Sequence, residues 1–317
     1  MKKTVMFLII AMLVTVVAAC GQKESKGDAS NAAATNQPAE ELTIKHELGE
    51  TKVKKNPSKI VVFDFGTLDS LDKLGIEVAA MPKGSLPPYL SKFEDDKYTN
   101  VGSLKEPDFE KINELAPDLI IISGRQSNMY EEFTKIAPTI YLGVDTARYM
   151  DSFKENATTI GQIFGKEEEV KTELASIDES IKKLNDKVKA NNKNALIILA
   201  NDGKISAYGA GSRFGIIHDV FGYTPVDNNI EVSTHGKSIS FEYIVEKNPD
   251  YLFVVDRGAA IGGESSAKQV VENELVKNTK AFKDGNIVYL DPSFWYLSGG
   301  GLLSVSEMVK EIDAGTK

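Results

Sequence analysis

The chain has 317 residues, a formal net charge of −9 and a hydrophobic fraction of 42%. This length predicts about two domains, and the ordinary globular composition excludes a mainly disordered, collagen-like or multi-span membrane protein. The acidic balance argues against nucleic-acid binding because no excess of basic residues can neutralise phosphates. The single cysteine excludes an internal disulfide and a cysteine-based zinc or iron–sulfur site.

The first twenty residues have the pattern of an export signal. Lys2 and Lys3 precede an apolar run over 5–19, which is shorter than the roughly 20 residues that span a bilayer as a helix. The run ends in Val17-Ala18-Ala19-Cys20, which resembles a bacterial lipoprotein box and implies cleavage before Cys20 and lipidation of its thiol. We therefore predict a signal peptide over 1–19. A plain signal peptide with an incidental cysteine is the alternative.

The next segment is predicted to be a flexible tether over 20–41. Residues 21–41 contain no aromatic and no branched aliphatic side chain, so they cannot contribute to a core. A flexible segment of this length spans roughly 25 Å. Removal of 1–19 takes away two lysines, so the mature chain has a charge of 35 − 46 = −11. These features predict an acidic exported domain tethered to the outer face of the cell membrane.

From residue 42 onward, short apolar runs alternate with amphipathic segments, which favours an α/β fold. Continuous apolar runs are typical of parallel strands that are covered on both faces. The predicted strands are Lys59–Phe63, Leu119–Ser123, Ala195–Leu199, Tyr251–Val255 and Ile287–Leu290.

An internal repeat divides this part of the chain into two similar lobes. Residues 105–125 and 237–257 align without a gap at an offset of 132, with identical residues at eight of 21 positions. Each copy predicts a capped helix, a Pro-Asp break and a strand that ends in arginine. We therefore predict an N-terminal α/β lobe over 42–148, a helical linker over 149–192 and a C-terminal α/β lobe over 193–317.

A long helix is predicted over Glu167–Ala190, within the linker. Its apolar residues recur at alternating steps of four and three, which places them on one face. Such a helix would be roughly 36 Å long, enough to brace two lobes. A short coiled-coil dimer is the competing interpretation of the same spacing.

Three arginines are the strongest candidates for ligand binding. Arg125 and Arg257 follow equivalent strands, and ligands of parallel α/β sheets bind beyond the carboxyl ends of the strands. Arg213 lies in a glycine-rich stretch, SAYGAGSRFG. A guanidinium is permanently charged and binds paired oxygens, so three of them in one cleft predict an oxygen-rich anion as the ligand. Separate surface salt bridges are the alternative.

Further candidates are aromatic, imidazole and carboxylate side chains. Trp295 and Tyr296, in the loop DPSFWYLSGGG, either stack on a ring-bearing ligand or fill a gap in the core. His235 lies in a polar loop as a ligand contact or a solvated side chain, whereas His218 lies in an apolar run and is predicted to be structural. Glu110 and Glu242 start equivalent helices, where the helix dipole favours an acid. They are also candidates for docking onto a basic membrane partner.

Sequence motifs of enzymes are absent from the chain, which contains no G-x-S-x-G, H-E-x-x-H or Walker A sequence. Phe214 stands where a dinucleotide-binding G-x-G-x-x-G pattern needs its last glycine. We predict a binding protein. An enzyme that acts on an anionic substrate at the cell surface is the alternative from a different class.

Taken together, the lipobox and the segments GRQS, KISAYGAGSRFGIIHDVFG, STHGKS, VVDRG and WYLSGGG resemble siderophore-binding lipoproteins of bacterial iron-uptake ABC transporters, in the petrobactin and catecholate branch. This resemblance implies a class III substrate-binding protein, with two Rossmann-like lobes joined by one rigid helix. It implies that Arg125, Arg213 and Arg257 hold an anionic ferric complex, with Tyr296 and Trp295 lining the cleft. Receptors for a hydroxamate siderophore or haem remain the alternatives within this class.

The same resemblance implies the partners. His235 and Tyr296 would bind iron only where the siderophore leaves coordination sites open, and the protein would hold no cofactor of its own. Glu110 and Glu242 would dock onto an ABC permease that works with its ATPase. The expected state is a lipid-anchored monomer on the extracytoplasmic face of the cell membrane.

Overall fold

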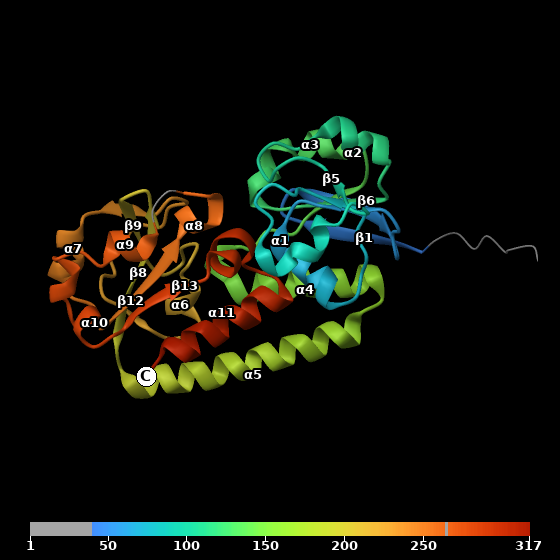
Figure 1. The fold of residues 1–317 in the computed structure, drawn as a ribbon. Helices are drawn as coiled ribbons and strands as arrows, with labels where there is room; N and C mark the ends of the chain where they lie inside the picture. Colours follow the sequence, from blue (N-terminus) through green and yellow to red (C-terminus); the bar gives the residue numbers. More distant parts are fainter. Residues whose placement is uncertain (1–39, 264–265) are drawn as a thin grey trace, which may run out of the picture. The chain divides into compact units, whose positions relative to one another are not determined.

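The computed structural model describes residues 40–263 and 266–317 (Figure 1). The predicted signal peptide, the predicted lipidation site Cys20 and all but the end of the predicted tether lie outside these residues. Among the helices of the described ranges, none combines the length and apolar character needed to cross a bilayer.

The first lobe is built on a parallel five-stranded sheet with strand order β5-β4-β3-β6-β7. All four residues of β6 are buried, as expected for a strand covered on both faces. An antiparallel hairpin that the sequence did not indicate, β1 paired with β2, precedes the sheet. The strands are β1 (Glu41–His46), β2 (Gly49–Lys54), β3 (Ile60–Val62), β4 (Ala80–Met81), β5 (Thr99–Asn100), β6 (Leu119–Ile122) and β7 (Thr139–Tyr141). The helices are α1 (Phe65–Lys73), η1 (Pro88–Glu94), α2 (Phe109–Leu115), η2 (Gly124–Met129) and α3 (Tyr130–Thr134).

The second lobe has a mixed sheet with strand order β11-β9-β8-β12-β13, and β10 pairs with β8. Strands β8, β12 and β13 are parallel, as predicted, but β9 and β11 run antiparallel at one edge. The strands are β8 (Asn194–Asn201), β9 (Lys204–Tyr208), β10 (Thr224–Pro225), β11 (Lys237–Ile239), β12 (Tyr251–Asp256) and β13 (Ile287–Leu290). The helices are α6 (Ile216–Asp219), α7 (Phe241–Lys247), α8 (Arg257–Ile261), α9 (Ala267–Val271), η4 (Val276–Asn278), α10 (Lys280–Lys283), η5 (Ser293–Ser298) and α11 (Leu302–Gly315).

Between the lobes the chain forms η3 (Thr146–Arg148), α4 (Tyr149–Phe164) and the long helix α5 (Glu167–Asn191), which lies beside α11 in Figure 1. The helix predicted over Glu167–Ala190 is confirmed. Its apolar stripe packs against α4 and α11 and joins one apolar cluster that includes residues of both lobes. Because the stripe is covered within the chain, the structure favours the brace over a coiled coil.

The two copies of the repeat have the same local structure. Helices α2 and α7 both end at a left-handed residue, Ala116 with φ 45° and Asn248 with φ 44°. The aspartate of each Pro-Asp break then holds the backbone at the start of the neighbouring strand. Asp118 accepts from the backbone N–H of Lys59 before β3 at 2.9 Å, and Asp250 accepts from Asn194 at the start of β8 at 3.2 Å. The repeated sequence therefore specifies how each helix is joined to its sheet.

Candidate ligand-binding site

Arg125 and Arg257 are held just beyond the carboxyl ends of equivalent strands by helix caps. Ser123 starts η2 after β6, and its backbone N–H donates to Oε1 of the buried Gln126 at 3.1 Å. Asp256 caps α8 after β12 by accepting from Ala259 N–H at 2.9 Å. Both arginines are half-buried, and the backbone from which each side chain extends is fixed by these hydrogen bonds.

Arg213 is placed by the glycine-rich turn between β9 and α6. Asp219 Oδ2 accepts from the backbone N–H of Gly211 at 2.7 Å, and Gly211 has a φ of 69°. A Cβ atom on Gly215 would lie 2.8 Å from Asp219 Oδ2 and from the Gly211 nitrogen, so the turn needs glycine there. Thr146, which precedes α4, donates to the Gly211 carbonyl at 3.1 Å and connects this turn to the inter-lobe segment.

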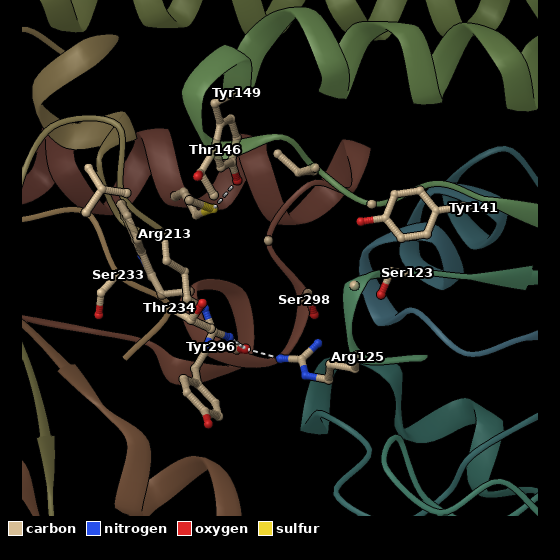
Figure 2. Close-up of a pocket in the computed structure, with 17 residues that line it drawn as sticks. Ser123, Arg125, Tyr141, Thr146, Tyr149, Arg213, Ser233, Thr234, Tyr296 and Ser298 are labelled. Carbon is tan, nitrogen blue, oxygen red and sulfur yellow. Dashed lines mark hydrogen bonds between the residues drawn. The ribbon is translucent and has the colours of Figure 1, made fainter. Parts of the chain in front are cut away.

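The three arginines converge on Tyr296, in the π-helical turn η5, and Figure 2 shows two of them, Arg125 and Arg213, beside it. The Tyr296 carbonyl accepts from Arg125 Nη2 at 2.7 Å and from Arg213 Nη2. The Tyr296 hydroxyl accepts from Arg257 Nε at 2.8 Å, and Asn201 Oδ1 accepts from Arg257 Nη1 at 2.7 Å. Carbonyls at the end of a helical turn carry partial negative charge, which favours cations at this position.

The ring of Tyr296 also lies beneath guanidinium charge. The Arg213 Cζ atom is 4.3 Å from the ring centroid and that of Arg257 is 5.8 Å away, both within cation–π range. Burial alone would raise the pKa of the Tyr296 hydroxyl, but the Arg257 hydrogen bond and the two guanidinium charges outweigh it and lower the pKa. Burial and the nearby Arg125 charge lower the pKa of Arg213, which stays protonated at neutral pH.

Three cavities surround Tyr296, and each is bordered by two of the three arginines. The first, of about 340 Å³, lies between Arg125 and Arg213 and is rich in hydroxyl groups (Figure 2). The second, of about 320 Å³, lies between Arg125 and Arg257. The third, of about 270 Å³, lies between Arg213 and Arg257. The three cavities therefore meet at the arginine triad and Tyr296.

The other predicted ligand contacts occupy different parts of these cavities. His235 is exposed and lines the third cavity. Trp295 lines the first cavity, but only 3% of its surface is exposed, and its indole N–H donates to Glu311 Oε2 at 2.6 Å. So little exposed surface leaves Trp295 no face on which a ligand ring could stack.

Two lysines that the sequence interpretation missed line the same region. Lys105 borders the second and third cavities, and Lys204 borders the third. Lys105 is the first residue of the internal repeat and lies at the same edge of the sheet as Arg125. Its position in the repeat could therefore have identified it as a site residue. Nothing in the local sequence marks Lys204, which reaches the site because β9 folds back antiparallel onto β8.

The remaining candidates lie away from the cavities. Glu110 and Glu242 are exposed in the first turns of α2 and α7 and line none of the three cavities. A hydrogen bond with Ser240 lowers the pKa of Glu242. His218 is buried with its Nδ1 2.9 Å from the Tyr223 carbonyl, which confirms its structural role. Within the described ranges, no group of three histidine, cysteine or carboxylate side chains could hold a metal ion.

Comparison of the sequence with known protein families gives a match. Residues 60–294 match the periplasmic binding protein family. The chain belongs to this family. Its membership confirms the prediction of a binding protein rather than an enzyme.

The similarity is high over the whole chain. The petrobactin-binding protein YclQ of Bacillus subtilis is 59% identical over 319 residues, which cover 99% of each chain. The ferric-anguibactin-binding protein FatB of Vibrio anguillarum is 31% identical and covers 88% of this chain and 89% of its own length. The crystal structure of YclQ matches with a TM-score of 0.86 and 63% identity over 88% of this chain and 99% of that chain.

A second solved structure, the catecholate-siderophore binding protein VctP of Vibrio cholerae, matches with a TM-score of 0.83 and 38% identity. This match covers 87% of this chain and all of VctP. The predicted fold class, two α/β lobes joined by a long helix as in class III binding proteins, is thereby confirmed.

Proposed function

We propose that this protein captures a ferric catecholate siderophore outside the cytoplasm and delivers it to an ABC permease. The observation that carries the proposal is the convergence of Arg125, Arg213 and Arg257 on Tyr296, with a cavity between each pair of arginines. Three permanent positive charges in a chain of net charge −9 form a local exception to its acidity. The names of the relatives YclQ and VctP support a catecholate ligand, and that of YclQ supports petrobactin.

The chemistry of the ligand matches this centre. A ferric tris-catecholate carries three negative charges, and a mixed complex of two catecholates and citrate is similarly anionic. Its charge is spread over oxygens that point outward from the iron, and guanidinium groups bind such oxygens with charge-assisted hydrogen bonds. Three cavities around one centre suit a ligand whose arms diverge from a single metal ion. Recognition therefore needs no bond to be made or broken in the ligand.

Direct contact with iron is proposed only for a siderophore that leaves coordination sites open. Tyr296 and His235 line the same third cavity. The lowered pKa of the Tyr296 hydroxyl favours the phenolate that a ferric ion binds. The iron in this proposal is cargo and arrives with the siderophore.

The rest of the proposal concerns delivery. Cys20 carries a lipid anchor that holds the mature chain at the outer face of the cell membrane. Glu110 and Glu242, exposed on equivalent helices of the two lobes, dock onto basic residues of the permease, which works with its ATPase. The chain acts as a monomer with lobes over 42–148 and 193–317 and a linker over 149–192.

A ligand panel tests the proposal. Purified protein is titrated with ferric petrobactin, ferric enterobactin, ferrichrome and haemin, with binding followed by calorimetry. We expect both catecholate complexes to bind and ferrichrome and haemin to bind at least a hundredfold more weakly. Preferential binding of ferrichrome or haemin would replace the proposed ligand by a hydroxamate siderophore or haem. Conversion of the bound ligand into a new product would support an enzyme instead.

A further inference from the structure

The segment Asp291–Gly301 carries the side chains and carbonyls on which the three arginines meet. We call it the ligand-facing segment. It contains Tyr296 with its two hydrogen-bonding groups, and Ser298 and Gly299 on the wall of the first cavity. It runs from the end of β13 to the start of α11. Its position therefore decides where the arginines are held. Its beginning is hydrogen-bonded to a carboxyl group on α11, and the first turn of α11, directly after its end, is capped by a carboxyl group on α1.

Glu311, on α11, holds the beginning of the ligand-facing segment. One oxygen, Oε2, accepts from the Trp295 indole N–H at 2.6 Å, and the other, Oε1, accepts from the backbone N–H of Asp291 at 3.3 Å. Among the described residues, no lysine, arginine or histidine forms an ion pair with this carboxyl group. Both of its oxygens are therefore committed to the residues that precede Tyr296.

Asp69, on α1 of the first lobe, holds the other end. Its Oδ1 accepts from the backbone N–H of Leu303 and its Oδ2 from that of Ser304, both at 3.1 Å. The neighbouring Ser70 Oγ accepts from Leu302 N–H at 2.9 Å. These N–H groups begin the 14-residue helix α11, whose own N-cap residue, Gly301, has no side chain to satisfy them. Helix α11 is therefore capped by side chains from a different lobe.

A hydrogen-bonded path leads from Asp69 to the first cavity. The Tyr89 hydroxyl donates to Asp69 Oδ2 at 3.2 Å and lies 2.5 Å from Ser298 Oγ on the cavity wall. The Tyr89 ring packs on Phe294, within the π-helical turn, at 4.8 Å between centroids. Asp69 is thus connected to the ligand-facing segment in two ways: through Tyr89, and through α11, the helix that follows the segment.

The backbone at this end is packed too closely for any other residue. A Cβ atom on Gly301 would lie 2.1 Å from Asp69 Oδ1 and 2.2 Å from the Gly66 carbonyl. One on Gly300, at φ 108°, would lie 2.4 Å from a Val144 methyl group. The glycines of WYLSGGG therefore allow α1 and the inter-lobe segment to approach the start of α11, which brings Asp69 within reach of its N–H groups.

We propose that Asp69 and Glu311 are positioning residues for ligand binding, which hold the ligand-facing segment from its two ends and so fix Tyr296 among the three arginines. For its ligand, this inference rests on the proposed function. The two residues act without touching the ligand, because neither lines any of the three cavities.

The charge state of the two carboxyl groups supplies a way to detect this role. Burial raises the pKa of Asp69 to about 7 and that of Glu311 to about 7. Asp69 faces Tyr89 from η1, Tyr149 from α4 and the N–H groups and Ser304 hydroxyl of α11, and none of these is a basic side chain. Glu311 faces Asp291 and Glu307, two further acids that favour its neutral form. Protonation of either carboxyl group turns one of its acceptor oxygens into a donor. This weakens the hydrogen bonds that hold the ligand-facing segment.

The test compares alanine variants with conservative ones. Asp69→Ala and Glu311→Ala should each raise the dissociation constant for ferric petrobactin roughly tenfold, the effect of one charge-assisted hydrogen bond. Glu311→Gln keeps one acceptor oxygen for the Trp295 indole and replaces the other by a donor, as protonation does, so it should fall between Glu311→Ala and the wild type. Asp69→Asn, with one acceptor oxygen instead of two, should fall between Asp69→Ala and the wild type. The matched control is Asp313→Asn, which changes an exposed carboxylate on α11, the helix of Glu311. This variant should bind like the wild type.

Two readouts separate positioning from a general loss of stability. If protonation of Glu311 weakens binding about threefold, less than its removal because one acceptor oxygen remains, the dissociation constant should rise roughly twofold between pH 8 and pH 6 through this group alone. Glu311→Gln should lack this increment, and it meets the same ligand, so protonation of the siderophore cancels in the comparison. In the ligand-free protein, Asp69→Ala should accelerate hydrogen exchange at the amides of Leu302, Leu303 and Ser304 while β8 and β12 stay protected.

The outcomes are distinct. Faster exchange at the start of α11 together with weaker binding supports the positioning role. Wild-type exchange in Asp69→Ala, or wild-type dissociation constants in both alanine variants, overturns it. A wild-type protein that binds no ferric petrobactin overturns the proposed function, and exchange in the ligand-free variants then decides the positioning role by itself.

Discussion

Replacing Arg125 by alanine removes the guanidinium that the first lobe contributes to the triad. In the structure this group donates to the Tyr296 carbonyl at 2.7 Å and to the Leu297 carbonyl at 3.4 Å. A ferric siderophore offers it anionic oxygens instead, and a hydrogen bond to a charged group contributes about 1.5–3 kcal/mol. Since about 1.4 kcal/mol corresponds to a factor of ten, the dissociation constant for ferric petrobactin should rise about 10- to 150-fold.

The Arg125→Ala variant is measured by calorimetric titration beside two controls. Arg125→Lys keeps the charge but loses the planar fork, so its affinity should lie between those of the wild type and the alanine variant. Arg148→Ala removes a guanidinium that is paired with Asp145 and Glu155 outside the cavities, so it changes the net charge equally and should leave binding unchanged. A dissociation constant for Arg125→Ala within twofold of the wild type, in a variant that unfolds at the wild-type temperature, would refute the role of the triad.

Three further predictions follow from other parts of the structure. A Glu110→Ala/Glu242→Ala double variant should bind ferric petrobactin normally, because neither residue lines any of the three cavities. Whole-cell uptake of labelled iron should nevertheless fall at least tenfold. Weakened binding of the siderophore would contradict the docking role. Gly301→Ala should lower the free energy of unfolding by about 1–3 kcal/mol, because its Cβ atom would overlap Asp69 Oδ1 and the Gly66 carbonyl. Urea unfolding against Gly84→Ala, where a Cβ atom would meet nothing closer than 3.5 Å, separates the overlap from the general effect of replacing a glycine, because neither glycine has a positive φ. Because folding raises the pKa of Asp69 to about 7, the folded protein keeps this proton between about pH 4 and pH 7 while the unfolded chain releases it. The free energy of unfolding should therefore decrease as the pH rises through this window, by up to about 1.4 kcal/mol per pH unit from this group, and the slope should be smaller in Asp69→Asn.

The sequence was most informative where a local pattern determines local structure. Continuous apolar runs located the parallel strands, the stepwise apolar spacing located α5, and the repeat placed Arg125 and Arg257 at equivalent strand ends. The convergence of the arginines could be inferred because the carboxyl ends of parallel strands meet at one edge. The carbonyl of Tyr296 as the shared acceptor of Arg125 and Arg213 could not be inferred, since a π-helical turn depends on one extra residue in a helical path and has no side-chain signature.

What escaped prediction depends on contacts between distant parts of the chain. Asp69 lies more than 230 positions from the N–H groups that it caps, and its segment has the pattern of an ordinary amphipathic helix. Lys204 reaches the third cavity only because β9 turns back onto β8. The indole of Trp295 faces α11 because Glu311 accepts its N–H, a partner 16 residues away that the loop sequence does not reveal. In each case the local residues allowed several environments and the tertiary packing selected one.

The shared carbonyl of Tyr296 has a consequence for unloading. Arg125 belongs to the first lobe, whereas Arg213 and Arg257 belong to the second, so a charge of +3 is assembled from contributions of +1 and +2 that meet at one residue, Tyr296. Coulomb attraction falls with distance, so a small separation of the lobes would withdraw a third of the charge that holds the anion. Under the proposed function, a permease that separates the two lobes would release the anionic ligand without competing for the ligand's own oxygens.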